Sequence, residues 1–255
     1  MKMPLVAAHR GCSGGNVHCN TWVAFEAALA QGADIIELDV TKSADGVLFV
    51  FLPGEEPHHL LSPRYIHEMT ADEVRKLRYI NIDHSPTSLG VSTLDDVLDQ
   101  LKDRCIVNID KFPDHPADVA AAVRRHGMQD QVFVKTPPTE EWFKTVEEVA
   151  PDLPYMVVTR NTDDFSTRLL GRKLRYLGTE ALFTNEEAQV AQTQYIEQMH
   201  RMGLKVWYNA IVCNNASVHA GIHAAGHNDD LSVSGQPDKG WGWLIDKGVD
   251  MIQTD

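Results

Sequence analysis

Residues 32–40 read GADIIELDV, a run in which apolar residues surround the carboxylates of Glu37 and Asp39. Gly32 is placed to end an amphipathic helix predicted over Thr21–Gln31, and Asp34–Val40 has the length and apolar content of a buried strand. Glu37 and Asp39 stand two residues apart, so on a strand both side chains point to the same face. We therefore expect these two carboxylates to act together, either in a functional site or in salt bridges.

The same alternation of an apolar run with an amphipathic stretch continues on both sides of residues 32–40. Further helices are predicted over Ser92–Asp103, Pro116–His126, Thr139–Val149 and Asn185–Met202. Strands are predicted over Leu5–His9, Asp34–Val40, Cys105–Asp110, Gln131–Lys135, Pro154–Thr159, Glu180–Thr184, Leu204–Asn209 and Val249–Thr254. Eight strands separated by helices predict an α/β protein, a (β/α)8 TIM barrel formed by a single domain over residues 1–255. The last strand reaches the last residues of the sequence, which leaves open whether a closing helix follows.

A turn signal, Asp45–Gly46, separates the second strand from another extended run, Val47–Leu52. Two residues cannot carry the crossover that a parallel connection needs. The sequence therefore predicts a hairpin excursion after strand two.

The composition excludes several classes of protein. The chain has 36 acidic and 23 basic residues, a formal net charge of −13, and 43% hydrophobic residues. This charge argues against nucleic acid or an anionic membrane as the main partner, and no run of about 18 apolar residues could span a membrane. We expect a small-molecule substrate. The 4 cysteines form no CxxC pair and no signal peptide is evident, so a reducing, cytoplasmic location is the default expectation; the oligomeric state stays open.

In a (β/α)8 barrel the functional site forms at the carboxyl ends of the strands. Asp110 ends the third predicted strand and could join Glu37 and Asp39. Three converging carboxylates repel one another unless a cation neutralises them, and all-oxygen ligands suit Mg²⁺ or Ca²⁺. The alternative is structural salt bridges with Arg10 or Lys111.

Several motifs resemble the glycerophosphodiester phosphodiesterase family. They are HRG at 9–11, NT at 20–21, GADIIELDV at 32–40, GLKVW at 203–207 and GVDMIQTD at 248–255. The resemblance implies a metal-dependent barrel that hydrolyses glycerophosphodiesters to glycerol 3-phosphate and an alcohol. It assigns the metal ligands to Glu37, Asp39 and Asp110, the first catalytic histidine to His9, and phosphate binding to Arg10.

The sequence departs from this family at the position of the second catalytic histidine, where Leu52 stands. Three interpretations compete: a catalytically silent relative that still binds metal and phosphate, an inactivating substitution, or replacement by His58 or His59. The family's lysine after the third ligand is also missing, since Phe112 takes its position and Lys111 is out of phase.

Positive charge for the substrate is therefore expected from Lys135, with Trp207 and Asn209 as further substrate-binding candidates. The segment from strand seven to Gly240 could form a loop over the substrate, and His219, His223 and His227 have a spacing compatible with a metal site. Asp110 in place of the family's usual Glu resembles spider-venom-type phospholipase D enzymes. Two alternative functions follow: Leu52 suggests a non-catalytic phosphate- or metal-binding barrel, and Asp110 suggests a lyase that forms a cyclic phosphate.

Overall fold

The computed structural model describes residues 3–212 and 223–255. By its internal contacts the chain divides into two compact units, which are described separately. The first unit comprises residues 1–9 and 135–255, and the second comprises residues 10–134. Cys213 and His219 lie outside the described residues.

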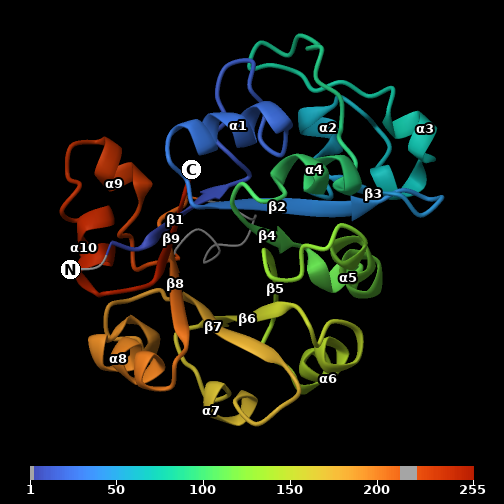
Figure 1. Cartoon of the computed structure of the whole chain (residues 1–255). Coiled ribbons are helices and arrows are strands. Elements are labelled where there is room, and N and C mark those ends of the chain that lie inside the picture. The colour runs from blue at the N-terminus through green and yellow to red at the C-terminus, as the bar shows by residue number, and fades with distance from the viewer. Residues whose placement is uncertain (1–2, 213–222) are drawn as a thin grey trace. The chain divides into compact units, whose positions relative to one another are not determined.

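The second unit is built on a short sheet that contains the GADIIELDV stretch. Strand β2 (Ile35–Lys42) pairs in parallel with β4 (Ile106–Asp110), which pairs with the start of β5 (Val132–Thr136). The predicted hairpin is present, because β3 (Leu48–Val50) runs antiparallel to β2. The main helices of this unit are α1 (Trp22–Ala30), α4 (Leu94–Leu101) and α5 (Pro116–Arg125) (Figure 1).

The excursion after β3 has a small core of its own. It carries α2 (Glu56–His59), the 3-10 helix η1 (Ile66–Glu68) and α3 (Ala71–Val74). Its buried apolar residues are Phe49, Phe51, Leu60, Ile66, Met69, Ala71, Val74, Tyr79 and Val91. The fully buried Glu56 carboxylate accepts hydrogen bonds from the backbone N–H groups of Gly54 and Ile66, both at 2.9 Å. These bonds satisfy a buried acid and fix the course of the loop.

The first unit is a parallel sheet in the order β1-β9-β8-β7-β6. Its strands are β1 (Leu5–His9), β6 (Pro154–Arg160), β7 (Arg175–Leu182), β8 (Lys205–Asn209) and β9 (Met251–Thr254). Its helices are α6 (Glu140–Val149), α7 (Ser166–Leu169), α8 (Thr193–Arg201), α9 (Asp229–Val233) and α10 (Trp241–Asp246) (Figure 1).

The fold class is the α/β, (β/α)8 TIM-barrel class that the sequence predicts. In the described residues, parallel strands alternate with helices from β1 to β9, and β3 is the added antiparallel strand. The single-domain prediction stays a prediction, because the internal contacts divide the chain into the two units given above.

Three segments of the first unit differ clearly from those predicted. The strand expected at Glu180–Thr184 starts earlier and runs over Arg175–Leu182. Gly178, at φ +146°, made this stretch look unlike a strand in the sequence. An added Cβ at Gly178 would lie 1.9 Å from the carbonyl oxygen of Lys205, so only glycine allows β7 and β8 to pair there. The helix expected from Asn185 begins only at Thr193, after a separate 3-10 turn at Gln189–Ala191.

The third difference concerns the segment from strand seven to Gly240, which was expected to be a loop. It carries α9, and α10 follows directly after Gly240. Asn228 caps α9 by accepting from the Leu231 N–H at 3.1 Å.

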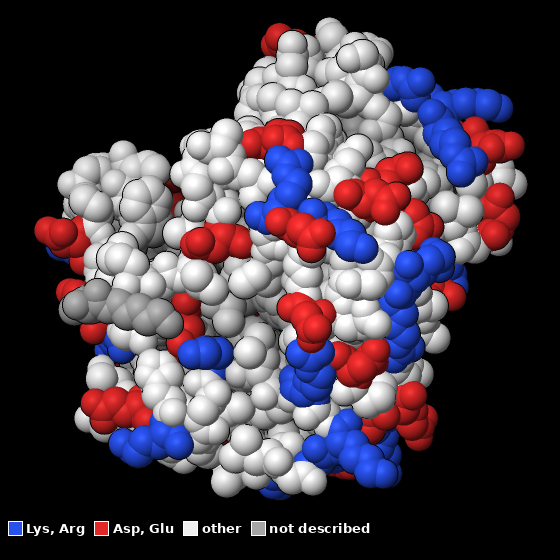
Figure 2. Space-filling model, in the orientation of Figure 1, with Lys and Arg blue, Asp and Glu red and all other residues white. Residues whose placement is uncertain are grey.

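The surface shows charges of both signs. Figure 2 shows Lys and Arg side chains interspersed with Asp and Glu on the face drawn, without one broad basic area. None of the helices in the described residues has the length and apolar character needed to cross a membrane.

Candidate active site

Three carboxylates converge in the second unit, as the sequence predicts. The parallel register sets Asp39 of β2 beside Asp110 of β4, and Glu37 lies two residues before Asp39 on the same face. One oxygen from each of the three side chains lies within 4.8 Å of the others. Glu37 and Asp39 are buried, with 2% and 0% exposure, and Asp110 is partly exposed. Such a group of oxygen donors can hold a hard divalent cation.

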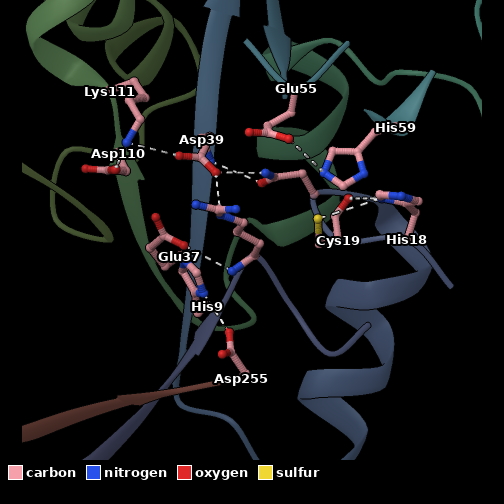
Figure 3. Close-up of polar contacts among 12 residues, drawn as sticks. His9, His18, Cys19, Glu37, Asp39, Glu55, His59, Asp110, Lys111 and Asp255 are labelled. Carbon is pink, nitrogen blue, oxygen red and sulfur yellow. Dashed lines mark hydrogen bonds and ion pairs between the residues drawn. The ribbon is translucent and has the colours of Figure 1, made fainter. Parts of the chain in front are cut away.

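Two basic side chains contact these carboxylates (Figure 3). Arg10 Nε lies 2.8 Å from Asp39 Oδ2, and Lys111 Nζ lies 2.5 Å from Asp110 Oδ2 and 3.4 Å from Asp39 Oδ1. Burial opposes the charge on Lys111, but the Asp110 and Asp39 carboxylates outweigh burial and raise its pKa. The salt bridges considered as an alternative are therefore present beside the possible metal site, and the two descriptions are compatible.

The structure corrects the interpretation of Lys111 as out of phase. Its backbone is left-handed, with φ of 59°, which turns the chain out of the extended geometry of β4. Alternation along a strand therefore stops at Asp110, and the Lys111 ammonium reaches the carboxylates.

Asn20 belongs to the NT motif, but the sequence alone assigned it no role in the site. Its amide donates to Asp39 Oδ2 at 2.9 Å and accepts from the Asp39 backbone N–H at 3.1 Å. Its own N–H donates to the carbonyl of Arg10 at 2.9 Å. Asn tolerates left-handed backbone better than most residues, and Asn20 has φ of 57°. Asn20 of the NT motif thus forms the turn and also binds Asp39 through two hydrogen bonds.

Arg10 and Gly11 of the HRG motif form a tight turn beside Glu37 of β2. The backbone N–H of Arg10 donates to Glu37 Oε2 at 3.0 Å, and Arg10 has φ of 60°. Gly11, at φ +79°, passes so close to α1 that an added Cβ would lie 2.7 Å from the backbone carbon of Ala24. Only glycine fits there, which explains its place after Arg10.

His9 belongs to the first unit and forms an ion-pair contact with the last residue of the chain. Its Nδ1 lies 2.7 Å from Asp255 Oδ1. A carboxylate on one ring nitrogen fixes the tautomer and orientation of an imidazole and favours its protonated form. Asp255 was not among the predicted site residues. Its position after the eighth predicted strand could have indicated it, because the site forms at the carboxyl ends of the strands.

The two histidines suggested as substitutes lie in different environments. His58 is exposed and pairs with Glu55 Oε2 at 3.0 Å. His59 is half-buried, and its ring packs edge-on against His18 at 4.4 Å and against Phe51 at 6.4 Å. Burial, followed by the electrostatic effect of the neighbouring His18, lowers the pKa of His59 to about 4. His59 is therefore the sheltered neutral imidazole, and His58 is a solvated one.

His18 was not identified from the sequence. Its ring stacks on Tyr79 at 4.5 Å, and burial lowers its pKa. No pattern of spacing relates His18 to His59, which lies 41 residues later on the excursion, so only the fold reveals their contact.

Lys135, Trp207 and Asn209 lie together in the first unit, where they enclose a buried acid. Lys135 Nζ is 2.6 Å from Glu180 Oε2 and 4.6 Å from the centre of the Trp207 ring. Asn209 Nδ2 donates to Glu180 Oε1 at 2.6 Å. Lys135, Glu180, Trp207 and Asn209 are all at most 5% exposed. A substrate role for Lys135 therefore requires that it share its charge with Glu180.

The histidine series after strand seven includes His219, which lies outside the described residues. His227 stacks on Trp243 at 3.8 Å, and its Nε2 lies 3.1 Å from Glu186 Oε1. Among the residues that the structure describes, Glu37, Asp39 and Asp110 form the cluster with metal-ligand geometry.

Comparison with known proteins gives one family model and several relatives. A family described as a domain of unknown function, DUF4996, matches residues 155–255. An uncharacterized protein of Bacillus subtilis is 31% identical over 143 residues, which are 52% of this chain and 58% of that protein. A glycerophosphodiester phosphodiesterase of Caldanaerobacter subterraneus is 29% identical over 140 residues, 52% of this chain and 57% of that protein. The chain thus aligns with somewhat more than half the length of these curated relatives.

Solved structures match nearly the whole chain. A glycerophosphodiester phosphodiesterase from Agrobacterium tumefaciens superposes with a TM-score of 0.71 and 27% identity, covering 99% of this chain and 96% of that one. An Oleispira antarctica phosphodiesterase, solved in complex with the product sn-glycerol-3-phosphate, has a TM-score of 0.68 and 16% identity, covering 99% and 93%. The second likeness shows the fold alone.

Proposed function

We propose that this chain, a relative of the glycerophosphodiester phosphodiesterases, hydrolyses a glycerophosphodiester to glycerol 3-phosphate and an alcohol with the help of a divalent cation. The observation that carries this proposal is the convergence of Glu37, Asp39 and Asp110 next to Arg10. The whole-length likeness to the Agrobacterium tumefaciens enzyme supports it.

The donor set fits Mg²⁺ or Ca²⁺. All three groups are carboxylates, and two of them are buried, so their mutual repulsion is poorly screened by solvent. Arg10 and Lys111 supply two positive charges against three negative ones, which leaves room for a further cation. Glu37, Asp39 and Asp110 would hold it, and a bound cation would polarise the phosphoryl oxygens.

Arg10 suits the role of phosphate clamp. Asp39 fixes its Nε at 2.8 Å, so the planar guanidinium is oriented before substrate arrives. A preorientated planar fork of donors matches phosphate oxygens and loses little conformational freedom on binding. The negative charge that develops on the phosphoryl group is stabilised by the same guanidinium.

Hydrolysis requires two proton transfers. The attacking hydroxyl forms a bond to phosphorus and loses its proton, while the bond from phosphorus to the leaving oxygen breaks and that oxygen gains a proton. His9, whose imidazolium form Asp255 favours, suits the donor. His59, which is neutral near pH 7, suits the acceptor and would replace the histidine missing at Leu52.

Two histidines of the same excursion test this assignment. His59→Gln is expected to lower kcat/KM by at least about a hundredfold, whereas His67→Gln, which alters an exposed histidine elsewhere on the excursion, is expected to change it less than about threefold. Release of glycerol 3-phosphate from a glycerophosphodiester is measured with Mg²⁺ or Ca²⁺, with EDTA, and for Glu37→Gln. Activity that survives both EDTA and Glu37→Gln contradicts the metal-dependent mechanism.

Leu52 favours one second candidate, a non-catalytic barrel that binds metal and phosphate. A chain of this kind would bind glycerol 3-phosphate in the presence of the cation and turn over no diester. Turnover at an ordinary enzyme rate contradicts it. The same assay, followed by ³¹P NMR, separates hydrolysis from the lyase alternative, because the lyase would give a cyclic phosphate.

A further inference from the structure

A cavity of about 440 Å³ lies in the second unit, between the loop that follows Gly11 and the excursion that follows β3. Its volume is within the range of small-molecule sites. Its lining residues include no Asp, Glu, Lys or Arg. The lining includes Gly14, Ile80, Ile82 and the four histidines His18, His58, His59 and His84.

Both walls of this cavity are tied to Asp39 of the carboxylate cluster. On one wall, His18 lies two residues before Asn20, whose amide makes two hydrogen bonds with Asp39. On the other wall, the ring of Phe51 packs against His59, and the Phe51 N–H donates to the Asp39 carbonyl at 3.0 Å. Figure 3 shows the His18 and His59 side chains close together beside Cys19, and their rings pack edge to face. The cavity therefore borders the site where the phosphodiester would bind.

Two of the four imidazoles in the walls, those of His18 and His59, are uncharged at neutral pH, because burial lowers the pKa of both. A neutral imidazole offers one N–H donor and one acceptor nitrogen, which is the pairing that a hydroxyl group requires. Ile80 and Ile82 add apolar surface for carbon atoms. The walls thus combine hydroxyl-binding groups with apolar contact and carry no fixed charge.

We propose that this cavity holds the alcohol leaving group and that this alcohol is an uncharged polyol, such as a glycerol or inositol group. The proposal rests on the proposed phosphodiesterase function and specifies its substrate. The attacking hydroxyl forms its bond to phosphorus and loses its proton, the bond between phosphorus and the polyol oxygen breaks, and that oxygen takes a proton from the donor assigned to His9. The neutral polyol remains in the cavity until release.

Charged alcohols fit the cavity less well. A choline or ethanolamine group needs an anion or exposed aromatic faces to replace its hydration. The Glu55 carboxylate nearby is paired with His58 at 3.0 Å, and it does not line the cavity. A second phosphate needs a fixed cation, and the lining residues include neither Lys nor Arg.

The leaving group can be tested alone, because all glycerophosphodiesters give the same product, glycerol 3-phosphate. With Mg²⁺ or Ca²⁺ present, kcat/KM is expected to be at least about tenfold higher for glycerophosphoglycerol and glycerophosphoinositol than for glycerophosphocholine. An equal or higher kcat/KM for glycerophosphocholine overturns the inference while leaving the proposed function intact.

Two variants locate the preference in the cavity. His18→Phe keeps a ring on Tyr79 but removes the hydrogen-bonding nitrogens, and it is expected to reduce the polyol preference to less than about threefold. Gly14→Leu adds bulk to the lining, where an added Cβ meets no atom within 4 Å. It is expected to lower kcat/KM for the inositol diester most. Gly171→Leu, at an equally open position in the first unit, is the control and should leave all diesters unaffected.

If no diester is turned over, the proposed function fails, and the cavity is tested by binding. Isothermal titration of the protein in Ca²⁺ with glycerophosphoinositol and glycerophosphocholine then decides. Tighter binding of the inositol diester that His18→Phe abolishes supports the inference. Equal binding, tighter binding of the choline diester, or no binding of either overturns it.

Discussion

Asp229 holds the backbone of Asp255: Asp229 Oδ2 accepts from the Asp255 N–H at 3.0 Å. Its other oxygen accepts from Thr254 Oγ1 at 2.7 Å and from Trp241 Nε1 at 2.6 Å. The buried Asp229 thus joins α9, α10 and the end of β9, and through Asp255 it fixes the carboxylate that contacts His9. We infer that Asp229 is a positioning residue for His9.

Asp255→Asn tests this relationship. Loss of the carboxylate is expected to lower kcat/KM about ten- to a hundredfold, since an amide stabilises the His9 imidazolium less well. The loss should appear in kcat, with KM changed less than about threefold, because the contact lies on the proposed proton donor. Asp229→Asn should give a smaller change in the same direction, while Asp230→Asn, at the exposed next position, should match the unaltered protein. An unchanged kcat in both variants contradicts the positioning role.

Cation binding is expected to stabilise the chain through Glu37, Asp39 and Asp110. A ligand that binds only the folded state adds about 2.7 kcal/mol when its concentration is one hundred times Kd. Thermal unfolding should therefore shift to higher temperature with Mg²⁺ or Ca²⁺, and Asp110→Asn should remove most of the shift. Asp114→Asn, an exposed acid four residues later, serves as control and should keep it. An undiminished shift in Asp110→Asn would place the cation elsewhere.

Leu52→His separates the interpretations of the missing histidine. If His59 accepts the proton, a histidine at position 52 is expected to raise kcat less than about threefold, and His59→Gln to remove activity in either background. A gain of a hundredfold or more in Leu52→His, with no loss in His59→Gln, would identify position 52 as the vacant proton-transfer position.

Burial of His59 makes stability depend on pH. Its pKa falls from 6.5 to about 4 on folding, so between these values the unfolded chain binds a proton that the folded chain does not. Stability is therefore full above pH 6.5 and decreases as the pH falls toward 4. The contribution is about 1–3 kcal/mol. Urea unfolding at pH 7.5 and 4.5 should show a smaller loss for His59→Gln than for the unaltered protein, and an identical loss in both would contradict this.

Much of the carboxylate cluster could be predicted because two local rules suffice. Alternation along β2 sets Glu37 and Asp39 on one face, and parallel pairing places the end of β4 beside them. Neither rule covers backbone that leaves the extended region. The left-handed residues Asn20 and Lys111 reach Asp39 through turns that no periodicity describes.

Contacts between segments far apart in the sequence could not be predicted from local sequence patterns either. His18 and His59 meet because the excursion folds on its own small core, and Asp255 meets His9 because β1 and β9 pair in parallel. The start of β7 was not predicted because glycine usually weakens a strand, whereas Gly178 allows β7 to approach β8 closely. The order of helices and strands predicts the fold class. The side chains that contact the site residues depend on how distant strands and loops pair, which the order alone does not give.

Lys135 and Glu180 offer a test of the substrate role first assigned to Lys135. Their ion pair is 2.6 Å long, and both residues are 5% exposed. Removing one partner leaves a buried charge uncompensated, which costs about 3–5 kcal/mol, whereas replacing both by apolar residues is often neutral.

Lys135→Met is therefore expected to lower the free energy of unfolding by about 3–5 kcal/mol, and the double variant Lys135→Met/Glu180→Met to recover most of that loss. Lys144→Met, at an exposed position of α6, is the control and should change the free energy by less than about 0.5 kcal/mol. Equilibrium unfolding in urea gives all three values. A folded double variant that keeps the KM of the unaltered protein assigns Lys135 to stability. A KM raised tenfold or more, with stability recovered, would return Lys135 to the substrate site.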